Sequence, residues 1–361
     1  MCLPSDRNPM FNLRSNRGRV LTLAALIGVT FLTMLFSLEA CGRLGKESPA
    51  EAGQLQSPAE TQHLKLIPYR KGEKWGFCDV NKKLVLQPKY DFADPFSEGL
   101  AGVGLNGQGF GFVDENGKEI IPLKYDFVEP FSEGMASVGL NKKSGFIDKS
   151  GKEVIPLKYD FVDPFSEGMA RVKLKNKVGF MDKSGKEVIP LQYDDGDSFS
   201  EGLAVVEMND KWGFIDKNGK EIIPLKYDGG SSFSEGMARV GFFGCAFIDK
   251  TGKEEEVLSH EYVCGEFSEG LILVKLNDKW GFFDKTGRQV IPPKYDFGFS
   301  FSDGLAAVEM NDKSGFIDKT GREVIPLKYR HAESFSKGLA EVTVNNKSGY
   351  IGRDGTEYFE P

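Results

Sequence analysis

Short runs of alternating apolar and polar residues recur from residue 64 to the end of the chain, with a repeat length of 33 to 35 residues. One column of these runs holds alanine in seven units, as at Ala101, and the column two residues later holds valine in eight, as at Val103. The position between them changes from Gly102 to Arg171 to Glu341, as expected of a solvent-facing column. The alternation predicts a strand in each unit whose alanine and valine side chains face a core.

A second and a third strand are predicted in each unit. Residues 211–216 are KWGFID, and their phenylalanine has an aromatic counterpart in all nine units. The residues from Asp216 to Gly219 are typical of a type I turn followed by a glycine with positive φ. A third strand over 221–223 ends at Pro224, which cannot donate to a ladder. Because a three-stranded meander of about 34 residues cannot bury an apolar face alone, neighbouring units must share their cores.

The predicted fold is therefore all-β, a tandem array of about nine three-stranded meander units over residues 64–361. The array opens with a first strand near Leu66 and finishes with a third strand near Tyr358, so that units are whole at both ends. A closed propeller often splits its last blade between the chain ends. The sequence thus favours an open or superhelical stack, and a propeller or closed ring is the alternative.

The repeated block carries a resemblance to a known family. KWGFIDKNGKEIIPLKYD, and FSEGLAVVEMND before it, resemble the bacterial WG-containing (KWG) repeat family, and the resemblance extends over residues 64–361. It implies a β-rich repeat protein that is often exported. It implies no known reaction.

Residues 1–63 differ in composition from the array. The uncharged run of 19 residues from Val20 to Leu38 follows a basic stretch, and a helix of that length spans about 28 Å, close to the bilayer core. Leu38 to Gly42 resembles the lipobox of bacterial lipoproteins, in which the cysteine, here Cys41, is lipidated, although Glu39 departs from that pattern. Residues 1–41 are therefore predicted to be a signal peptide or an uncleaved anchor, and residues 42–63 a disordered tether. The array would be attached to the membrane at the cell envelope, outside the cytoplasm.

Charge and residue usage exclude several classes of function. The net charge is −7, whereas a nucleic-acid binder needs a basic surface. With three histidines and scattered cysteines, no zinc site or other cofactor is expected. The recurring aspartate, as at Asp216, and the recurring serine, as at Ser200, are interpreted as turn residues that bond the local backbone. Because active sites are singular and these columns are periodic, the chain is predicted not to be an enzyme.

The segment after the recurring tyrosine varies most from unit to unit, and in repeat proteins such variation often maps to one binding face. We expect its acids, which have no matching bases within these segments, to line one edge and to attract a cationic partner. The alternative is that these loops vary because nothing constrains them. The candidate binding residues are Asp94, Glu129, Asp163, Asp195 and Asp197.

The leading functional hypothesis is a non-enzymatic envelope protein whose loop-lined surface binds a protein or glycan partner. The alternative is a structural spacer or assembly element without a specific ligand, and an enzyme is a distant third. Trp75, Trp212 and Trp280 are interpreted as partly covered strand residues, with stacking on sugars or peptides as the other option. Cys245 and Cys264 lie in the same irregular unit and are candidates for a disulfide, since disulfides persist outside the cytoplasm.

Overall fold

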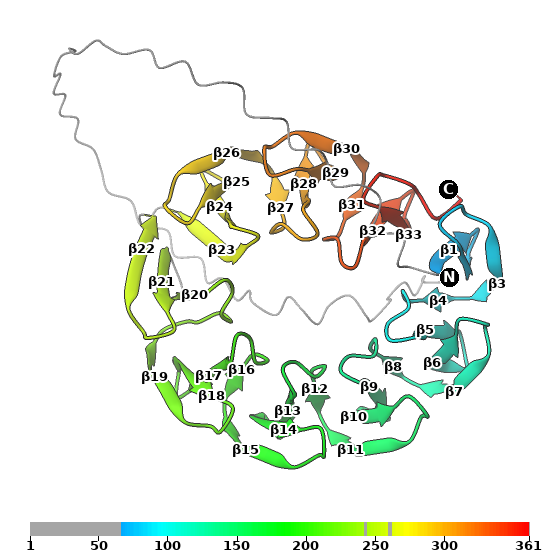
Figure 1. Cartoon of the computed structure of the whole chain (residues 1–361), viewed down its shortest axis with the longest axis horizontal. Coiled ribbons are helices and arrows are strands. Elements are labelled where there is room, and N and C mark those ends of the chain that lie inside the picture. The colour runs from blue at the N-terminus through cyan, green and yellow to red at the C-terminus, as the bar shows by residue number, and fades with distance from the viewer. Residues whose placement is uncertain (1–65, 242–243, 259–261, 361) are drawn as a thin grey trace, which may run out of the picture. The chain divides into compact units, whose positions relative to one another are not determined.

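The structure is a computed structural model that describes residues 66–241, 244–258 and 262–360, and within these ranges the chain forms strands and turns but no helix. The described strands pair into nine antiparallel sheets that follow one another along the chain (Figure 1), and we call them blades 1 to 9. Blades 2 to 5, 7 and 8 have four strands, and blades 1, 6 and 9 have three. The predicted all-β array of repeats is confirmed.

The strands of each blade are ordered from the centre outwards (Figure 1). The innermost strands are β4 (Phe92–Ala93), β8 (Phe127–Val128), β12 (Phe161–Val162), β16 (Asp195–Gly196), β23 (Val263–Ser268), β27 (Phe297–Gly298) and β31 (His331–Ala332). The second strands are β1 (Ile67–Lys71), β5 (Leu100–Leu105), β9 (Met135–Leu140), β13 (Met169–Leu174), β17 (Leu203–Met208), β20 (Met237–Val240), β24 (Leu271–Leu276), β28 (Ala306–Met310) and β32 (Leu339–Val344). The third strands are β2 (Lys74–Cys78), β6 (Gly109–Asp114), β10 (Lys143–Asp148), β14 (Lys177–Asp182), β18 (Lys211–Asp216), β21 (Cys245–Asp249), β25 (Lys279–Asp284), β29 (Lys313–Ile317) and β33 (Lys347–Gly352). The outer strands are β3 (Leu84–Tyr90), β7 (Glu119–Tyr125), β11 (Glu153–Tyr159), β15 (Glu187–Tyr193), β19 (Glu221–Tyr227), β22 (Glu254–Leu258), β26 (Gln289–Tyr295) and β30 (Glu323–Tyr329).

The innermost strand is the element that the sequence did not predict. In blade 2 it is β4, whose two residues Phe92 and Ala93 pair with Gly104 and Val103 of β5. Two residues are too few for an alternation to be visible, so the pattern predicts a loop after the recurring tyrosine. The three predicted strands of a unit thus become the outer three strands of a four-stranded blade. The predicted end of the third strand at Pro224 is wrong, because β19 continues through this proline to Tyr227 at the outer edge of the sheet, where no further strand needs its missing N–H.

The recurring aspartate has the turn role that its position predicts. In blade 2 one carboxylate oxygen of Asp114 accepts hydrogen bonds from the amides of Asn116 and Lys118, each at 2.9 Å. These bonds hold the turn between the third and outer strands, where Gly117 adopts a φ of 77°.

The glycine of the repeated block is required by the close approach of the outer strand. A Cβ atom at Gly111 would lie 2.4 Å from the carbonyl oxygen of Ile121. The pairing of β6 with β7 shifts register on both sides of Phe112, so the outer strand bends over this position. Any side chain at Gly111 would push the two strands apart.

Each hydrophobic core lies between two adjacent blades, as predicted. Phe112 and Ile121 of blade 2 pack with Val128, Ala136 and Val138 of blade 3, and each is at most 5% exposed. Ala136 and Val138 belong to the alanine and valine columns, so the predicted core-facing columns are confirmed. A blade alone holds no complete core, and the stability of the fold depends on contacts between neighbours.

The recurring serine joins adjacent blades. The hydroxyl of Ser97 donates to the carbonyl oxygen of Phe131 in the next blade at 2.7 Å, and the bond recurs as far as that from Ser302 to Phe335. The prediction of a bond to the local turn is therefore wrong. Within its own turn Ser97 already pairs through its backbone amide with Leu100, which leaves the hydroxyl for the neighbouring blade.

The recurring glutamate beside this serine makes a second link between blades. The carboxylate of Glu98 accepts a hydrogen bond from the amide of Gly134 at 3.1 Å and pairs with the ammonium group of Lys149 at 3.1 Å, both in blade 3. The same pair of contacts recurs from Glu167 to Gly202 and Lys217. Blades 2 to 8 thus each present an acceptor to the next blade in the chain.

The last blade meets the first through the C-terminal residues. The amide of Arg70 in β1 donates to the carbonyl oxygen of Tyr358 at 3.3 Å, and the amide of Glu360 donates to the carbonyl oxygen of Arg70 at 2.9 Å. Phe359 lies opposite Arg70 in this short bridge, with the guanidinium 5.7 Å from the centre of its ring. These residues cover part of the inner edge of blade 1.

The blades therefore form a closed nine-bladed propeller. The open or superhelical stack that the sequence favoured is wrong, and the alternative, a propeller, is confirmed. Phe359 pairs with Arg70 where, in blade 2, Phe92 pairs with Gly104. The chain can close although both terminal units are nearly whole, because three C-terminal residues replace a complete shared strand. We call the contact between blades 9 and 1 the seam; it also holds the edge-to-face rings of Trp75 and Tyr350, whose centres are 5.7 Å apart.

The residue that forms the polar link between blades changes from an acid to a base near the seam. The recurring glutamate is replaced in blade 9 by Lys337, whose ammonium group donates to the hydroxyl of Ser97 in blade 2 at 3.0 Å. In its described residues blade 1 has neither the inner strand nor the turn that carries this position, so the contact passes from blade 9 to blade 2. A glutamate at Lys337 could not donate to this hydroxyl.

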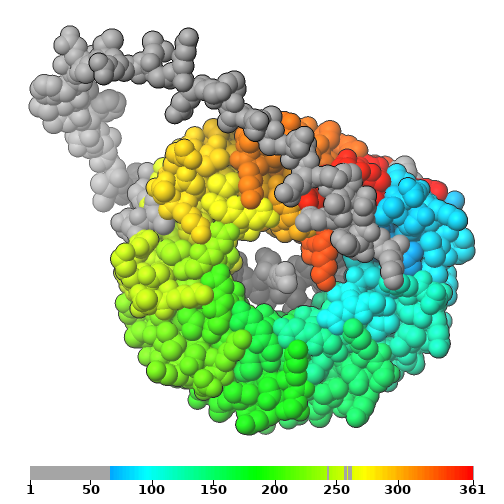
Figure 2. Space-filling view, viewed as in Figure 1, coloured from blue at the N-terminus to red at the C-terminus, as the bar shows by residue number. Residues whose placement is uncertain are grey.

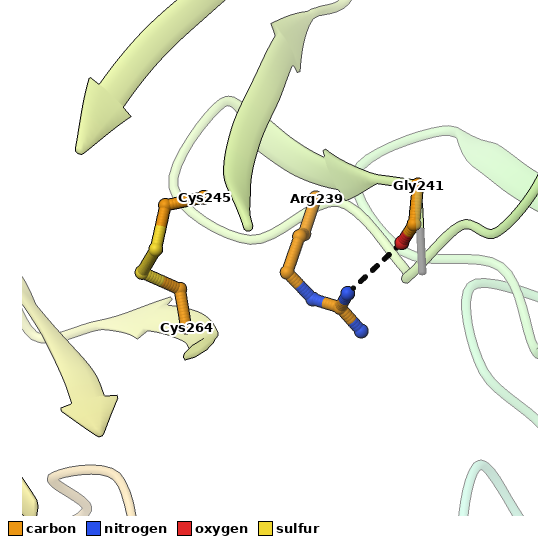
Figure 3. The surroundings of a disulfide bond; sticks show 4 residues. All are labelled: Arg239, Gly241, Cys245 and Cys264. Atoms are coloured by element: carbon orange, nitrogen blue, oxygen red, sulfur yellow. Dashed lines mark hydrogen bonds between the residues drawn. A yellow bond between two sulfur atoms is a disulfide. The ribbon is translucent and has the colours of Figure 1, made fainter. Parts of the chain in front are cut away.

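Blade 6 departs from the common pattern. Ala246 replaces the recurring glycine, and Cys245 lies opposite Leu258 in a changed register. Figure 3 shows Cys245 joined to Cys264 of blade 7 by a disulfide, with Cα atoms 5.3 Å apart. Beside it, Arg239 of β20 donates to the carbonyl oxygen of Gly241 at 3.1 Å. The covalent bond lies at the interface where the repeated strand pairing is altered.

Replacing Cys245 and Cys264 together by alanine should weaken this interface more than any other. A cross-link closing a loop of this size contributes about 3 kcal/mol to the free energy of unfolding, so a loss of that order is expected. Hydrogen exchange should accelerate in β20 to β24, and blades 2 to 4 of the same protein serve as the control. Two free thiols in alkylated, non-reduced wild-type protein would contradict the disulfide.

The predictions for the N-terminal part concern residues outside the described ranges. They are the signal peptide or anchor over 1–41, lipidation of Cys41 and the tether over 42–63. Within the described part of the chain there is no helix long and apolar enough to cross a membrane.

Candidate functional site

The acids predicted to bind a partner lie beside the inner strands. The backbone amide of Asp94 donates to the carbonyl oxygen of Gly102 at 2.9 Å, directly after β4. Glu129 and Asp163 make the same bond after β8 and β12. Because this bond fixes the backbone, the acids occupy one defined position at the inner edge of successive blades, around the central opening shown in Figure 2.

The five acids belong to four consecutive blades. Asp94, Glu129 and Asp163 follow the inner strands of blades 2, 3 and 4, Asp195 begins β16 of blade 5, and Asp197 follows it. The expectation that they share one edge agrees with this placement. They lie on inner strands or directly after them, however, and not on free loops.

Part of this acidic run has a base, contrary to the expectation from the segments alone. Arg171 of β13 places its Nε atom 2.5 Å from Oδ2 of Asp163 and its Nη1 atom 3.7 Å from Oδ1 of Asp195. The Arg171 side chain is only 14% exposed. The base was missed because it comes from the neighbouring strand and not from the variable segment.

The side chain of Asp94 has a strongly raised pKa. It is partly buried, and burial together with the negative charges of Glu129 and Glu341 raises the pKa of Asp94 to about 8. Glu341 belongs to blade 9, and burial raises the pKa of its carboxyl as well. Burial also raises the pKa of Tyr350, to which the charges of Asp94 and Glu341 contribute. At neutral pH most Asp94 side chains therefore hold a proton.

The acidic column is interrupted in blade 6 by Ser231 and in blade 8 by Phe299, which both take the position of Asp94. The ring of Phe299 lies 5.1 Å from that of Phe297 and 6.3 Å from that of His331, measured between ring centres. These aromatic residues were not predicted from the sequence. The signal that could have found them is the phenylalanine in a column that is acidic in blades 2 to 5.

The recurring tryptophans are covered to different degrees. Trp75 is 9% exposed and packs between blades 1 and 2, whereas Trp212 and Trp280 are partly buried. This agrees with partly covered strand residues. Only Trp280 adjoins the aromatic residues of blade 8, with its ring centre 6.2 Å from that of Phe297.

The site thus consists of carboxylates and aromatic rings around the central opening. Among the residues that the structure describes, no group of three or more His, Cys, Asp or Glu side chains is placed to hold a metal ion. A carboxyl such as Asp94, whose pKa is raised by burial and by neighbouring negative charges, can bind a cation and release a proton.

The fold defines a class of protein, the β-propeller built from tandem repeats. The model of the WG containing repeat matches residues 75–108, 110–143, 145–177, 179–212, 212–241, 246–280, 280–313 and 315–347. The chain therefore belongs to the WG repeat family.

Comparisons with other proteins add the fold alone. A crystal structure of the eukaryotic initiation factor is similar with a TM-score of 0.58 and 12% identity, over 81% of this chain and 94% of that chain. The computationally designed Ika8 protein is similar with a TM-score of 0.47 and 12% identity, over 73% of this chain and 93% of that chain. No curated protein matches this chain.

Proposed function

We propose that the protein is a non-enzymatic binding protein whose inner strands bind a basic segment of a protein partner. The alignment of Asp94, Glu129 and Asp163 at one position after successive inner strands carries this proposal. The raised pKa of Asp94, caused by burial and by the charges of Glu129 and Glu341, supports it. A cationic side chain between Asp94 and Glu129 would stabilise both carboxylates, since an opposite charge within about 4–6 Å favours the ionised form. A neutral glycan would provide no such stabilisation.

Coupling between binding and protonation follows from this arrangement. Asp94 holds a proton in the free protein near neutral pH and would release it when a cation binds. Affinity should therefore increase from pH 6 to pH 8 for a ligand whose own charge is constant over this range. The exposed part of the attraction is screened by salt beyond about 8–10 Å.

The test is the affinity of a lysine hexapeptide, measured by fluorescence anisotropy, for the double variant Asp94→Asn/Glu129→Gln. We expect roughly tenfold weaker binding, a change of about 1.4 kcal/mol, together with a smaller dependence on salt. The matched control is Glu119→Gln/Glu153→Gln, which replaces the same number of carboxyl groups by amides at exposed positions on outer strands β7 and β11. Equal affinities in the two double variants would overturn the proposal.

We also propose that the propeller works outside the cytoplasm, attached to the cell envelope through residues 1–63. The disulfide between Cys245 and Cys264 supports this location, because such bonds are rare in reducing compartments.

A further inference from the structure

Blade 8 exposes an aromatic ring that its counterparts cover. Phe297, the first residue of inner strand β27, is 42% exposed. Phe92, Phe127 and Phe161 hold the same position in blades 2, 3 and 4, and each is only partly exposed. An exposed phenylalanine beside carboxylates at the inner edge of the propeller can contact a ligand that packs on the aromatic ring and carries positive charge.

Blade 4 shows what occupies this position elsewhere in the same fold. The guanidinium of Arg171 lies over the ring of Phe161, 5.6 Å from its centre, while bonding to the carboxylate of Asp163. A guanidinium can stack on an aromatic face and bond to a carboxylate at the same time. In blade 4 the face of the Phe161 ring is therefore covered by an arginine of the same blade.

Blade 8 has the ring without this arginine. Ala307 occupies the position of Arg171, and Glu309, opposite Phe297 in the strand register, occupies that of Lys173. Two cationic positions of blade 4 have thus become one small residue and one carboxylate. The hydroxyl of Ser314 donates to Glu309 at 3.5 Å and adds no charge.

The surroundings of Phe297 contain aromatic rings, carboxylates and one histidine. Trp280, Phe297, Phe299 and His331 form a row in which successive rings are inclined by 72°, 84° and 73°. Nε2 of His331 lies 2.8 Å from Oε1 of Glu333. This hydrogen bond raises the pKa of His331, with further contributions from the charges of Glu333, Glu309 and Glu341.

We propose that Phe297, Phe299 and Glu309 form an arginine subsite, in which a guanidinium group of the partner takes the place that Arg171 takes in blade 4. The proposal rests on the proposed function for the basic nature of the partner, but it concerns a different blade. Steeply inclined rings leave single ring faces on which a planar guanidinium can stack, whereas a flat sugar needs one broad face. The carboxylate of Glu309 supplies the hydrogen-bond acceptor.

The experiment compares an arginine hexapeptide with a lysine hexapeptide of equal charge. Wild-type protein should prefer the arginine peptide by about fivefold. Phe297→Ala should reduce this preference several-fold, and Phe297→Tyr, which keeps the ring, should retain it. The matched control Phe92→Ala removes the corresponding ring of blade 2, which packs on Phe110, and should leave the preference unchanged.

A second variant tests the subsite without removing a ring. Ala307→Arg gives blade 8 the arginine that blade 4 has, and arginine is already accommodated at the equivalent positions 171 and 239. We expect this side chain to cover Phe297 and to abolish the preference for the arginine peptide. An unchanged preference in folded Ala307→Arg and Phe297→Ala proteins, checked by their melting temperatures, would overturn the subsite.

The two proposals fail in different ways. If the subsite is wrong but the proposed function is right, both peptides still bind more weakly to Asp94→Asn/Glu129→Gln, while Phe297→Ala leaves their ratio unchanged. If neither peptide binds the wild-type protein, both proposals fail.

Discussion

Between pH 6 and pH 8 the protein should lose about 2 kcal/mol of its free energy of unfolding through Asp94 alone. The folded-state pKa of this carboxyl is about 8, above the value of about 3.9 for an unfolded aspartate. A group with a raised folded-state pKa contributes stability that is complete below its unfolded pKa and is lost as the pH rises through its folded pKa. The loss approaches about 1.4 kcal/mol per pH unit between the two values, reduced here because Asp94 retains some contact with water.

Denaturant unfolding at pH 6, 7, 8 and 9 measures this loss. Asp94→Asn should remove most of it, and Glu129→Gln should move it to lower pH, because the charge of Glu129 contributes to the raised pKa of Asp94. His331, whose pKa is also raised, contributes a loss of the same sign, so His331→Gln is needed to separate the two groups. If Asp94→Asn and wild type respond identically to pH, the excess negative charge at Asp94 is refuted.

Removing the aromatic ring of Phe359 should open the seam. This side chain is 6% exposed and fills the space above Gly349, so Phe359→Ala should cost about 3 kcal/mol, as expected for a buried phenylalanine near a chain end. Since three C-terminal residues cover the inner edge of β1 within the described part of the chain, the contact between Trp75 and Tyr350 should weaken as well. The expected readouts are faster hydrogen exchange in β1 and β33 and a changed tryptophan emission.

Phe165→Ala is the matched control for this prediction. Phe165 is 3% exposed and packs on Phe146 between blades 3 and 4, so its removal should lower stability by a comparable amount. Exchange in β1 and β33 should then remain slow under native conditions. Comparable exchange at the seam in both variants would show that the ring opens elsewhere first.

The repeated columns of the sequence were sufficient to predict three of the four strands of a blade, the turn that follows the third strand, and the shared cores. The alternation of apolar and polar residues predicts that Ala136 and Val138 are buried. The spacing of Asp114 and Gly117 in the sequence predicts the turn between them. Closure could not be predicted, because it depends on the rotation between adjacent blades, and no single column records that angle. One sign of closure is visible in the sequence: Lys337 stands in the column that is acidic in the other units, as at Glu98.

The candidate site was predicted in part. Asp94, Glu129 and Asp163 were found because they recur at one position, and they do share the inner edge. Arg171 was missed because its contact with Asp163 depends on the pairing of β13 with β12, and β12 has only two residues. Phe297 was missed because its importance depends on the residue with which it pairs on the neighbouring strand. That residue is Glu309 in blade 8, whereas the equivalent residue of blade 4 is Lys173.

The seam determines which changes in blade number the chain can tolerate. Links of the kind formed by Ser97 and Glu98 repeat head to tail, and contacts of this kind do not by themselves specify how many units a ring contains. The residues that close the ring, Arg70 and Phe359, lie near the two ends of the array. Duplication or loss of one internal unit during evolution would leave both closing partners intact and would alter the width of the central opening. Family members with eight or ten units could therefore form rings around ligands of different size while keeping the same closing contact.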